Sequence, residues 1–167
     1  RWGAPSENQV YADDKGNIGY KPAGRFPKRK NWDGLLPVPG NGQYEWDGYF
    51  DMDTLPIEYN PKRGYLATAN SMNLPLGYPI KDFKIGFEWS APWRYLRIIE
   101  ALEGNANHSM EDSARLQRDY RSLLAREVIS KLPRLSAYDQ NLLSNWDFVL
   151  SPDSSSAALW AVWYYKY

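Results

Sequence analysis

Proline and glycine interrupt the first half of the chain so often that no long helix fits there. Between positions 22 and 42 they include Pro22, Pro27, Pro37, Pro39, Gly40 and Gly42. Proline lacks a backbone donor and glycine favours turns, so both end regular helices. The same region carries too many apolar side chains for a floppy linker. The sequence therefore predicts an ordered irregular segment, of the kind that is functional or wraps a core.

A hairpin is expected before this segment. The sequence QVYADDKGNIGYK places two strand-like runs, 9–12 and 18–21, on either side of the turn-forming run 13–17. Turn residues between two such runs indicate a pair of antiparallel strands.

Helical patterns begin near Ser90. In SAPWRYLRIIEALEG, apolar residues recur at helical spacing from Trp93 to Leu102. Ser90 is the expected N-cap, and Gly104 is the expected stop. The pattern predicts one amphipathic helix between these two residues.

A longer helix is expected over 109–132. Ser109 and Asp112 have the spacing of a capping box, an apolar stripe follows them, and Pro133 ends the pattern. No other stretch of the chain has so complete a set of helix signals.

Two shorter helical patterns follow. Ser136 and Asp139 repeat the capping device before a third helix, and a fourth helix is expected after Asp153. We therefore expect two domains. The first is a β and loop segment, 1–89, and the second is a helical subdomain, 90–167.

Charge, cysteine and histidine content exclude several classes of function. Lys and Arg total 20 and Asp and Glu total 20, so no net charge favours nucleic acid or an anionic membrane. The absence of cysteine excludes a thiolate nucleophile, and a single histidine excludes a multi-histidine metal site. That residue, His108, precedes a helix cap and is interpreted as a solvated loop histidine. No apolar run reaches the length of about 18 residues that a membrane span needs.

Common catalytic and binding motifs are missing from the sequence. There is no phosphate-binding loop, dinucleotide-binding loop, zinc-protease motif or nucleophile elbow. Asp51, Asp53 and Glu58 lack the spacing of an EF-hand loop and are interpreted as solvated. The 8 Trp and 13 Tyr leave one alternative class open, a non-catalytic module that binds carbohydrate or a protein partner.

One asparagine stands where a strand gives way to an irregular loop. In GYLATANSMNLPLGYP, the strand-like start ends at Asn70 and the remainder cannot form regular structure. Asn70 is either a turn former, since asparagine tolerates positive φ, or an amide donor aimed at a developing oxyanion. The residues alone leave both interpretations open.

Five motifs occur in the order found in one enzyme family. They are YADDKGNIGYKPAGRFPKR, LPVPGNGQYEWDGY, NPKRGYLATANS, WRYLRI and SMEDSARLQRDYRS. From Tyr11 to Asp147 the chain resembles penicillin acylases, which are N-terminal nucleophile hydrolases of the penicillin amidase family. The resemblance is to an internal part of the β subunit. It implies an α+β fold, a fragment of the four-layer αββα sandwich, with a hairpin and long ordered loop followed by a helical subdomain.

The resemblance also implies a reaction. Family members attack an amide with an N-terminal serine, which autocatalytic cleavage of a precursor exposes and whose own amine acts as base. The parent is expected to hydrolyse linear N-acyl amides, such as β-lactam side chains or acyl-homoserine lactones, with roles in antibiotic resistance or biosynthesis or in quorum quenching. The chain starts at Arg1 and stops inside a hydrophobic run, which we interpret as a fragment without the nucleophile. The isolated chain is expected to be inactive.

Two catalytic positions are implied within this chain. Asn70 matches the asparagine whose amide donates to the oxyanion, and Asn73 is the alternative if the loop aligns differently. Arg94 matches the arginine that supports the amino end of the nucleophile and the substrate region. Arg97 is its alternative if the register slips, and a surface arginine is the other interpretation of Arg94.

A calcium site and several partners are also implied. Several family members hold a structural calcium ion between subunits; Asp82 matches one carboxylate ligand, and a backbone carbonyl near Gly34 matches another contact. A solvated turn aspartate is the alternative for Asp82. No organic cofactor, nucleic acid or membrane span is implied. The expected partners are the rest of the β subunit, the α subunit of an autoprocessed heterodimer and a small acyl-amide substrate, in the periplasm or outside the cell.

Overall fold

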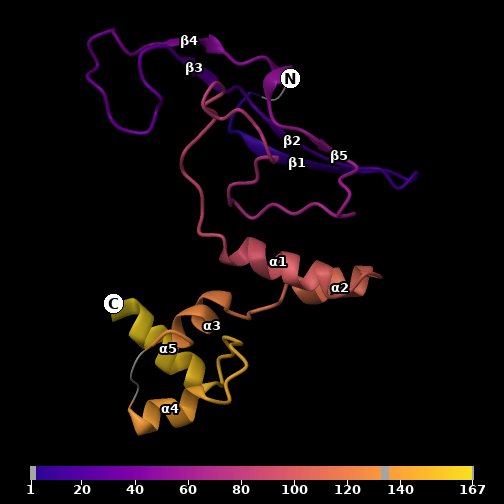
Figure 1. Ribbon diagram of the computed structural model, residues 1–167, viewed down its shortest axis with the longest axis vertical. Coiled ribbons are helices and arrows are strands. Elements are labelled where there is room, and N and C mark those ends of the chain that lie inside the picture. The colour runs from indigo at the N-terminus through magenta and orange to yellow at the C-terminus, as the bar shows by residue number, and fades with distance from the viewer. Residues whose placement is uncertain (1–2, 133–135, 167) are drawn as a thin grey trace. The chain divides into compact units, whose positions relative to one another are not determined.

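The computed structural model describes residues 3–132 and 136–166 of the 167-residue chain. It divides into two compact units, Arg1–Ser90 and Ala91–Tyr167. Among the described residues, the strands lie in the first unit and the α-helices lie in the second (Figure 1). The chain therefore belongs to the α+β class, as expected.

The predicted hairpin is confirmed, and its strands are longer than expected. Strand β1 (Glu7–Ala12) pairs antiparallel with β2 (Ile18–Ala23). Strand β5 (Glu58–Tyr59) pairs with the other edge of β2, opposite Gly19 and Tyr20, and completes a 3-stranded sheet. Figure 1 shows these three strands side by side.

One carboxylate organises the turn of the hairpin. The Asp13 carboxylate accepts hydrogen bonds from the Asn17 backbone N–H at 2.8 Å, from Asn17 Nδ2 at 2.9 Å and from the Tyr11 hydroxyl at 2.6 Å. The Asn17 amide, followed by the Tyr11 hydroxyl, lowers the pKa of Asp13 to about 2. Gly16 adopts a φ of 81°, a conformation that a residue without Cβ accepts readily. Local chemistry therefore fixes this turn.

The proline- and glycine-rich segment contains regular structure at its two ends. Strands β3 (Pro27–Arg29) and β4 (Trp46–Tyr49) form an antiparallel pair. The expectation of an irregular segment throughout is wrong there, because this pairing joins residues far apart in the sequence. In the connecting loop 30–45, Leu35 and Leu36 are 56% and 70% exposed, so these two side chains are not covered by a core of the described residues.

The acidic residues near position 51 have structural partners. Asp51 caps a short 3₁₀ helix, η1 (Met52–Thr54), by accepting from the Asp53 N–H at 3.2 Å. Glu58 forms an ion pair with Arg63 at 2.5 Å. Asp51 and Asp53 are exposed, in line with their interpretation as solvated, whereas Glu58 is half-buried and paired. The buried side chains of this unit include Tyr20, Ala23, Leu55, Ala69 and Ser71.

Helix α1 (Trp93–Glu103) confirms the first predicted helix but starts differently. Pro92 occupies the N-cap position instead of Ser90 and makes no side-chain capping bond. The Ser90 backbone N–H instead donates to the Asn70 carbonyl at 2.7 Å, within the first unit. Gly104 ends the helix as predicted.

The helix predicted over 109–132 forms two separate helices. Helix α2 (Met110–Leu116) begins with the predicted capping box of Ser109 and Asp112. Helix α3 (Leu123–Ile129) follows after a non-helical stretch. The prediction of one continuous helix is therefore wrong, although its start is confirmed.

Tertiary contacts interrupt the helical pattern over 117–122. Arg121 forms a β-bridge with Val149, and the Ser122 backbone N–H donates to the Phe148 carbonyl at 2.8 Å. The Ser122 hydroxyl then caps the N-terminus of α3. Partners outside the helix thus bind backbone groups that a continuous helix would have paired internally.

Helices α4 (Ala137–Leu143) and α5 (Ser155–Lys166) confirm the last two predicted helices. Ser136 caps α4 by accepting from the Asp139 N–H at 3.1 Å, as predicted. Pro133, the predicted end of the preceding helix, lies outside the described residues. The core of this unit is formed by Ala125, Leu143, Trp146, Ala157 and Trp160.

Candidate active site

Asn70 lies at a bend of the backbone. No strand includes the residues 64–70 in the described part of the chain, so the strand expected before Asn70 is wrong. Asn70 adopts a φ of 59°, in the left-handed region. Asparagine tolerates this conformation better than most residues that carry a Cβ. The backbone therefore has the geometry of the turn-forming interpretation, which leaves the role of the side-chain amide as a separate question.

Burial and one hydrogen bond hold the backbone around Asn70. The flanking residues Ala69 and Ser71 are 6% and 5% exposed, whereas Asn70 itself is exposed. The Asn70 carbonyl accepts the Ser90 N–H at 2.7 Å. The backbone that carries Asn70 is thus held in place, while the Asn70 side chain lies at the surface.

Asn73, the alternative donor, has a structural partner. Its Nδ2 donates to Asn8 Oδ1 at 3.3 Å, and the Tyr20 hydroxyl donates to the same oxygen at 2.8 Å. Burial raises the pKa of Tyr20 to about 12, so its hydroxyl keeps its proton at neutral pH. The Asn73 amide therefore attaches the loop to strand β1.

The loop after Asn73 combines anchored and exposed side chains. The Tyr78 hydroxyl donates to the Thr54 carbonyl at 3.2 Å, and the Tyr78 ring lies 6.3 Å from that of Phe83. Met72 and Leu76, in contrast, are 63% and 107% exposed. The loop therefore presents two apolar side chains to the surface of this chain.

Asp82 lies in an exposed turn at the end of this loop. Its backbone N–H donates to the Pro79 carbonyl at 3.0 Å. Across residues 3–132 and 136–166, no group of three or more His, Asp or Glu side chains is arranged to hold a metal ion. The type of ligand at Asp82 suits calcium, but its role there stays a prediction.

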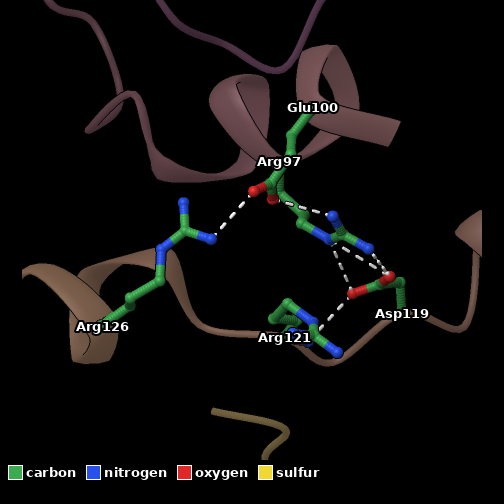
Figure 2. A network of polar contacts seen from close by, with 5 residues as sticks. All are labelled: Arg97, Glu100, Asp119, Arg121 and Arg126. Atoms are coloured by element: carbon green, nitrogen blue, oxygen red, sulfur yellow. Dashed lines mark hydrogen bonds and ion pairs between the residues drawn. The ribbon is translucent and has the colours of Figure 1, made fainter. Parts of the chain in front are cut away.

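Arg94 and Arg97 have different surroundings on α1. Arg94 is exposed in the first turn of the helix. The side chain of Arg97 is 22% exposed and forms ion pairs with Asp119, from Nη2 to Oδ2 at 2.6 Å, and with Glu100, from Nη1 to Oε2 at 2.8 Å (Figure 2). Arg97 is therefore part of a structural network.

This network connects α1 with the chain around the start of α3. Glu100 Oε1 accepts from Arg126 Nη1 at 2.8 Å, and Asp119 Oδ1 accepts from the Arg121 backbone N–H at 2.9 Å. The hydrogen bonds from Arg97 lower the pKa of Asp119. The hydrogen bond from Arg126, followed by that from Arg97, lowers the pKa of Glu100. Both carboxylates are therefore ionised at neutral pH.

No sequence motif singles out Asp119, Glu100 or Arg126. These residues belong to different elements, and no fixed spacing links them. A weak signal does exist, because Asp119 and Ser122 are cap-forming residues in the middle of a helical pattern. That pair could have indicated the break between α2 and α3.

His108 is more enclosed than a solvated loop histidine. It is half-buried, and its Nε2 lies 3.1 Å from Ser113 Oγ. Its Nδ1 is buried and has no hydrogen-bond partner within the part of the chain that the structure describes. The interpretation of His108 as solvated is therefore wrong, because helix α2 folds next to it.

The α+β fold and the motif order together indicate a class of amide-hydrolysing enzymes. A comparison with protein families identifies the family within this class. The model of the family described as penicillin amidase matches residues 1–167. The chain belongs to this family, whose members are amidases and acylases.

Particular relatives include enzymes with two named activities. The acyl-homoserine lactone acylase QuiP of Pseudomonas aeruginosa is 33% identical over 182 residues, which cover 95% of this chain and 21% of that protein. Penicillin G acylase of Escherichia coli is 41% identical over 98 residues, which cover 58% of this chain and 11% of that protein. The chain thus spans about a fifth of the length of the QuiP relative.

A solved structure shows the same fold. Thermostable penicillin G acylase from Alcaligenes faecalis superposes with a TM-score of 0.66 at 25% identity, covering 90% of this chain and 28% of that one. The predicted fold class, part of an N-terminal nucleophile hydrolase fold, is thereby confirmed. None of the helices in the described residues has the length and apolar character to cross a membrane.

Proposed function

We propose that this chain is a segment of the β subunit of an acylase, and that the whole enzyme hydrolyses a linear N-acyl amide. The observation that carries the proposal is the family match over the full chain, residues 1–167. The names of two relatives, an acyl-homoserine lactone acylase and a penicillin G acylase, support an acyl amide as the substrate.

The proposed reaction has two steps. The hydroxyl of an N-terminal serine attacks the amide carbonyl carbon, and the α-amino group of that serine takes the proton. The tetrahedral intermediate then collapses: the C–N bond breaks, the amine leaves with the proton, and an acyl-serine ester remains. Water hydrolyses the ester and releases the carboxylic acid. On this proposal the serine belongs to another part of the enzyme, so the isolated chain is inactive.

Asn70 is the proposed side-chain donor to the oxyanion of that intermediate. A donor of this kind is effective because it is fixed before the negative charge develops. The buried neighbours Ala69 and Ser71 and the 2.7 Å hydrogen bond from Ser90 support this role by holding the backbone that carries the amide.

Arg94 is the proposed supporting cation. A nearby positive charge disfavours protonation of an amine, so a guanidinium beside the serine α-amino group would keep that amine neutral and able to act as base. The exposed position of Arg94 in the first turn of α1 supports this role.

Asp82 is the proposed contribution of this chain to a structural calcium ion. Calcium takes about six to eight oxygen ligands, and one carboxylate supplies at most two of them. The other ligands would come from the rest of the enzyme, including an α subunit produced by self-cleavage of a precursor. The proposed location of such an enzyme is the periplasm or the outside of the cell.

The acyl group of the substrate is proposed to be apolar. Met72 and Leu76 are 63% and 107% exposed, and they lie in the loop that follows Asn70. Large apolar side chains with this exposure are suited to contact an acyl chain. Both a β-lactam side chain and an acyl-homoserine lactone carry such a group.

The test is an assay of the full-length polypeptide that carries this segment. N-acyl homoserine lactones and a chromogenic phenylacetyl anilide serve as substrates, and mass spectrometry of the quenched reaction locates the acyl group. We expect release of the amine and acylation of the N-terminal serine of the β subunit, with no turnover by the isolated chain. Turnover by the isolated chain, or acylation of another residue, would overturn the proposal.

A further inference from the structure

Charged side chains attach helix α1 to the rest of its unit. None of the residues of α1 is fully buried, so the helix has no deep apolar anchor in the described residues. Two of its side chains, Arg97 and Glu100, instead form ion pairs with residues after α2. These pairs therefore contribute to the orientation of α1 alongside its half-buried apolar side chains.

The pair between Arg97 and Asp119 has the geometry of a specific clamp. Arg97 Nε lies 3.2 Å from both carboxylate oxygens of Asp119, and Nη2 lies 2.6 Å from Oδ2. Figure 2 shows the two groups facing each other across the space between α1 and the 119–121 segment. The two side chains are 22% and 21% exposed, which limits solvent screening. Two-nitrogen contact of this kind fixes direction as well as distance.

Asp119 is itself fixed, so it can act as an anchor. Its Oδ1 accepts from the Arg121 backbone N–H at 2.9 Å. The same stretch is bound on its other side, by the bridge of Arg121 with Val149 and by the bond from the Leu150 N–H to the Tyr120 carbonyl at 3.0 Å. The Asp119 carboxylate thus belongs to a stretch of backbone that hydrogen bonds hold in place.

We propose that Asp119 is a positioning residue that acts through Arg97 to set the orientation of α1, and thereby of Arg94. Arg94 lies one helical turn before Arg97, so a rotation or shift of α1 moves both together. The inference rests on the proposed function, since it assigns Asp119 a role only if Arg94 serves the reaction. Misplacement of a functional group by about 1 Å can cost 10²-fold in rate.

The experiment uses the full-length enzyme with Asp119→Asn, which keeps the shape of the side chain and removes its charge. Asp119→Glu keeps the charge, and Glu127→Gln is the control. Glu127 forms an ion pair with Lys131 within the same unit, and no ion pair joins it to α1 in the described part of the chain. We expect Asp119→Asn to lower kcat by about 10- to 10²-fold. Asp119→Glu should recover part of that loss, and Glu127→Gln should leave kcat unchanged.

The deciding readout is a double substitution. If Asp119 acts through Arg94, Asp119→Asn adds no further loss of kcat in an Arg94→Ala background. An independent loss in that background would overturn the inference and leave Asp119 as a structural residue. Arg97→Lys, which keeps the charge but loses the two-nitrogen contact, repeats the test in case Asp119→Asn fails to fold.

Failure of the inference and failure of the proposed function give different results. If Arg94→Ala retains full kcat, the proposed role of Arg94 is wrong, and the inference falls with it. If Arg94→Ala lowers kcat while both Asp119→Asn and Arg97→Lys retain it, only the positioning role is wrong.

Discussion

Asn70→Gly separates the two roles of Asn70. Glycine accepts the φ of 59° without strain, and it removes the side-chain amide. Loss of one oxyanion donor costs about 10²- to 10³-fold in kcat, or about 2.7–4 kcal/mol of transition-state stabilisation. We expect this loss in the full-length enzyme, with KM nearly unchanged because the donor acts mainly in the transition state.

Two further variants serve as matched controls. Asn70→Ala removes the same amide but places a Cβ in the left-handed region, at a cost of roughly 1–2 kcal/mol in stability. We expect it to lose as much kcat as Asn70→Gly and to melt at a lower temperature. Asn73→Ala removes the neighbouring amide, which contacts Asn8 at 3.3 Å, and should leave kcat nearly unchanged.

The assay follows hydrolysis of a chromogenic phenylacetyl anilide, with active sites counted from the burst of released amine. Thermal melting of each variant checks that the fold is intact. A kcat of Asn70→Gly near that of the unsubstituted enzyme would refute the oxyanion role and leave Asn70 with its turn-forming role alone. A large loss in Asn73→Ala would transfer the role to Asn73.

Two predictions concern stability. Hydrogen bonds hold the pKa of Asp13 at about 2, so its contribution to stability is complete above about pH 4 and is lost as the pH falls through about 2. The difference in melting temperature between the unsubstituted protein and Asp13→Asn should shrink over that range, and a constant difference would contradict this. Trp160 is 5% exposed, so Trp160→Ala should destabilise the helical unit by about 3–5 kcal/mol, seen as a lower melting temperature. Tyr165 is 92% exposed, and an equal effect of Tyr165→Ala would refute the assignment of the core.

Local chemistry made part of the fold predictable. The hairpin follows from Asp13 and Gly16, which organise its turn with partners at most four residues away. The capping box of Ser109 and Asp112 is equally local, and it is present in the structure. In such cases the residues that make the contact all lie within the short sequence pattern itself.

Long-range contacts determine the helix boundaries that could not be predicted from the sequence. Ser90 does not cap α1, which begins at Trp93 with Pro92 at its N-cap, and the Ser90 backbone N–H instead binds the distant carbonyl of Asn70. The helix predicted over 109–132 is broken because Arg121 pairs with Val149. Nothing near Ser90 or Arg121 in the sequence identifies these distant partners.

The candidate site also combines features that are predictable from local sequence with features that depend on long-range contacts. The positive φ of Asn70 is foreseeable from the residue type, whereas its proposed chemistry came from the order of motifs around it. The network of Arg97 with Asp119 and Glu100 joins separate elements, so it emerged only from the structure (Figure 2).

The central claim is that Asn70 stabilises a tetrahedral oxyanion, and a transition-state analogue tests it most directly. An acyl-chain boronic acid forms a tetrahedral adduct with a serine hydroxyl, whereas the product carboxylate resembles the ground state. We expect Asn70→Gly to weaken inhibition by the boronic acid about 10²-fold or more and to leave carboxylate binding nearly unchanged. Equal Ki values for the boronic acid in the unsubstituted enzyme and in Asn70→Gly would contradict the oxyanion role.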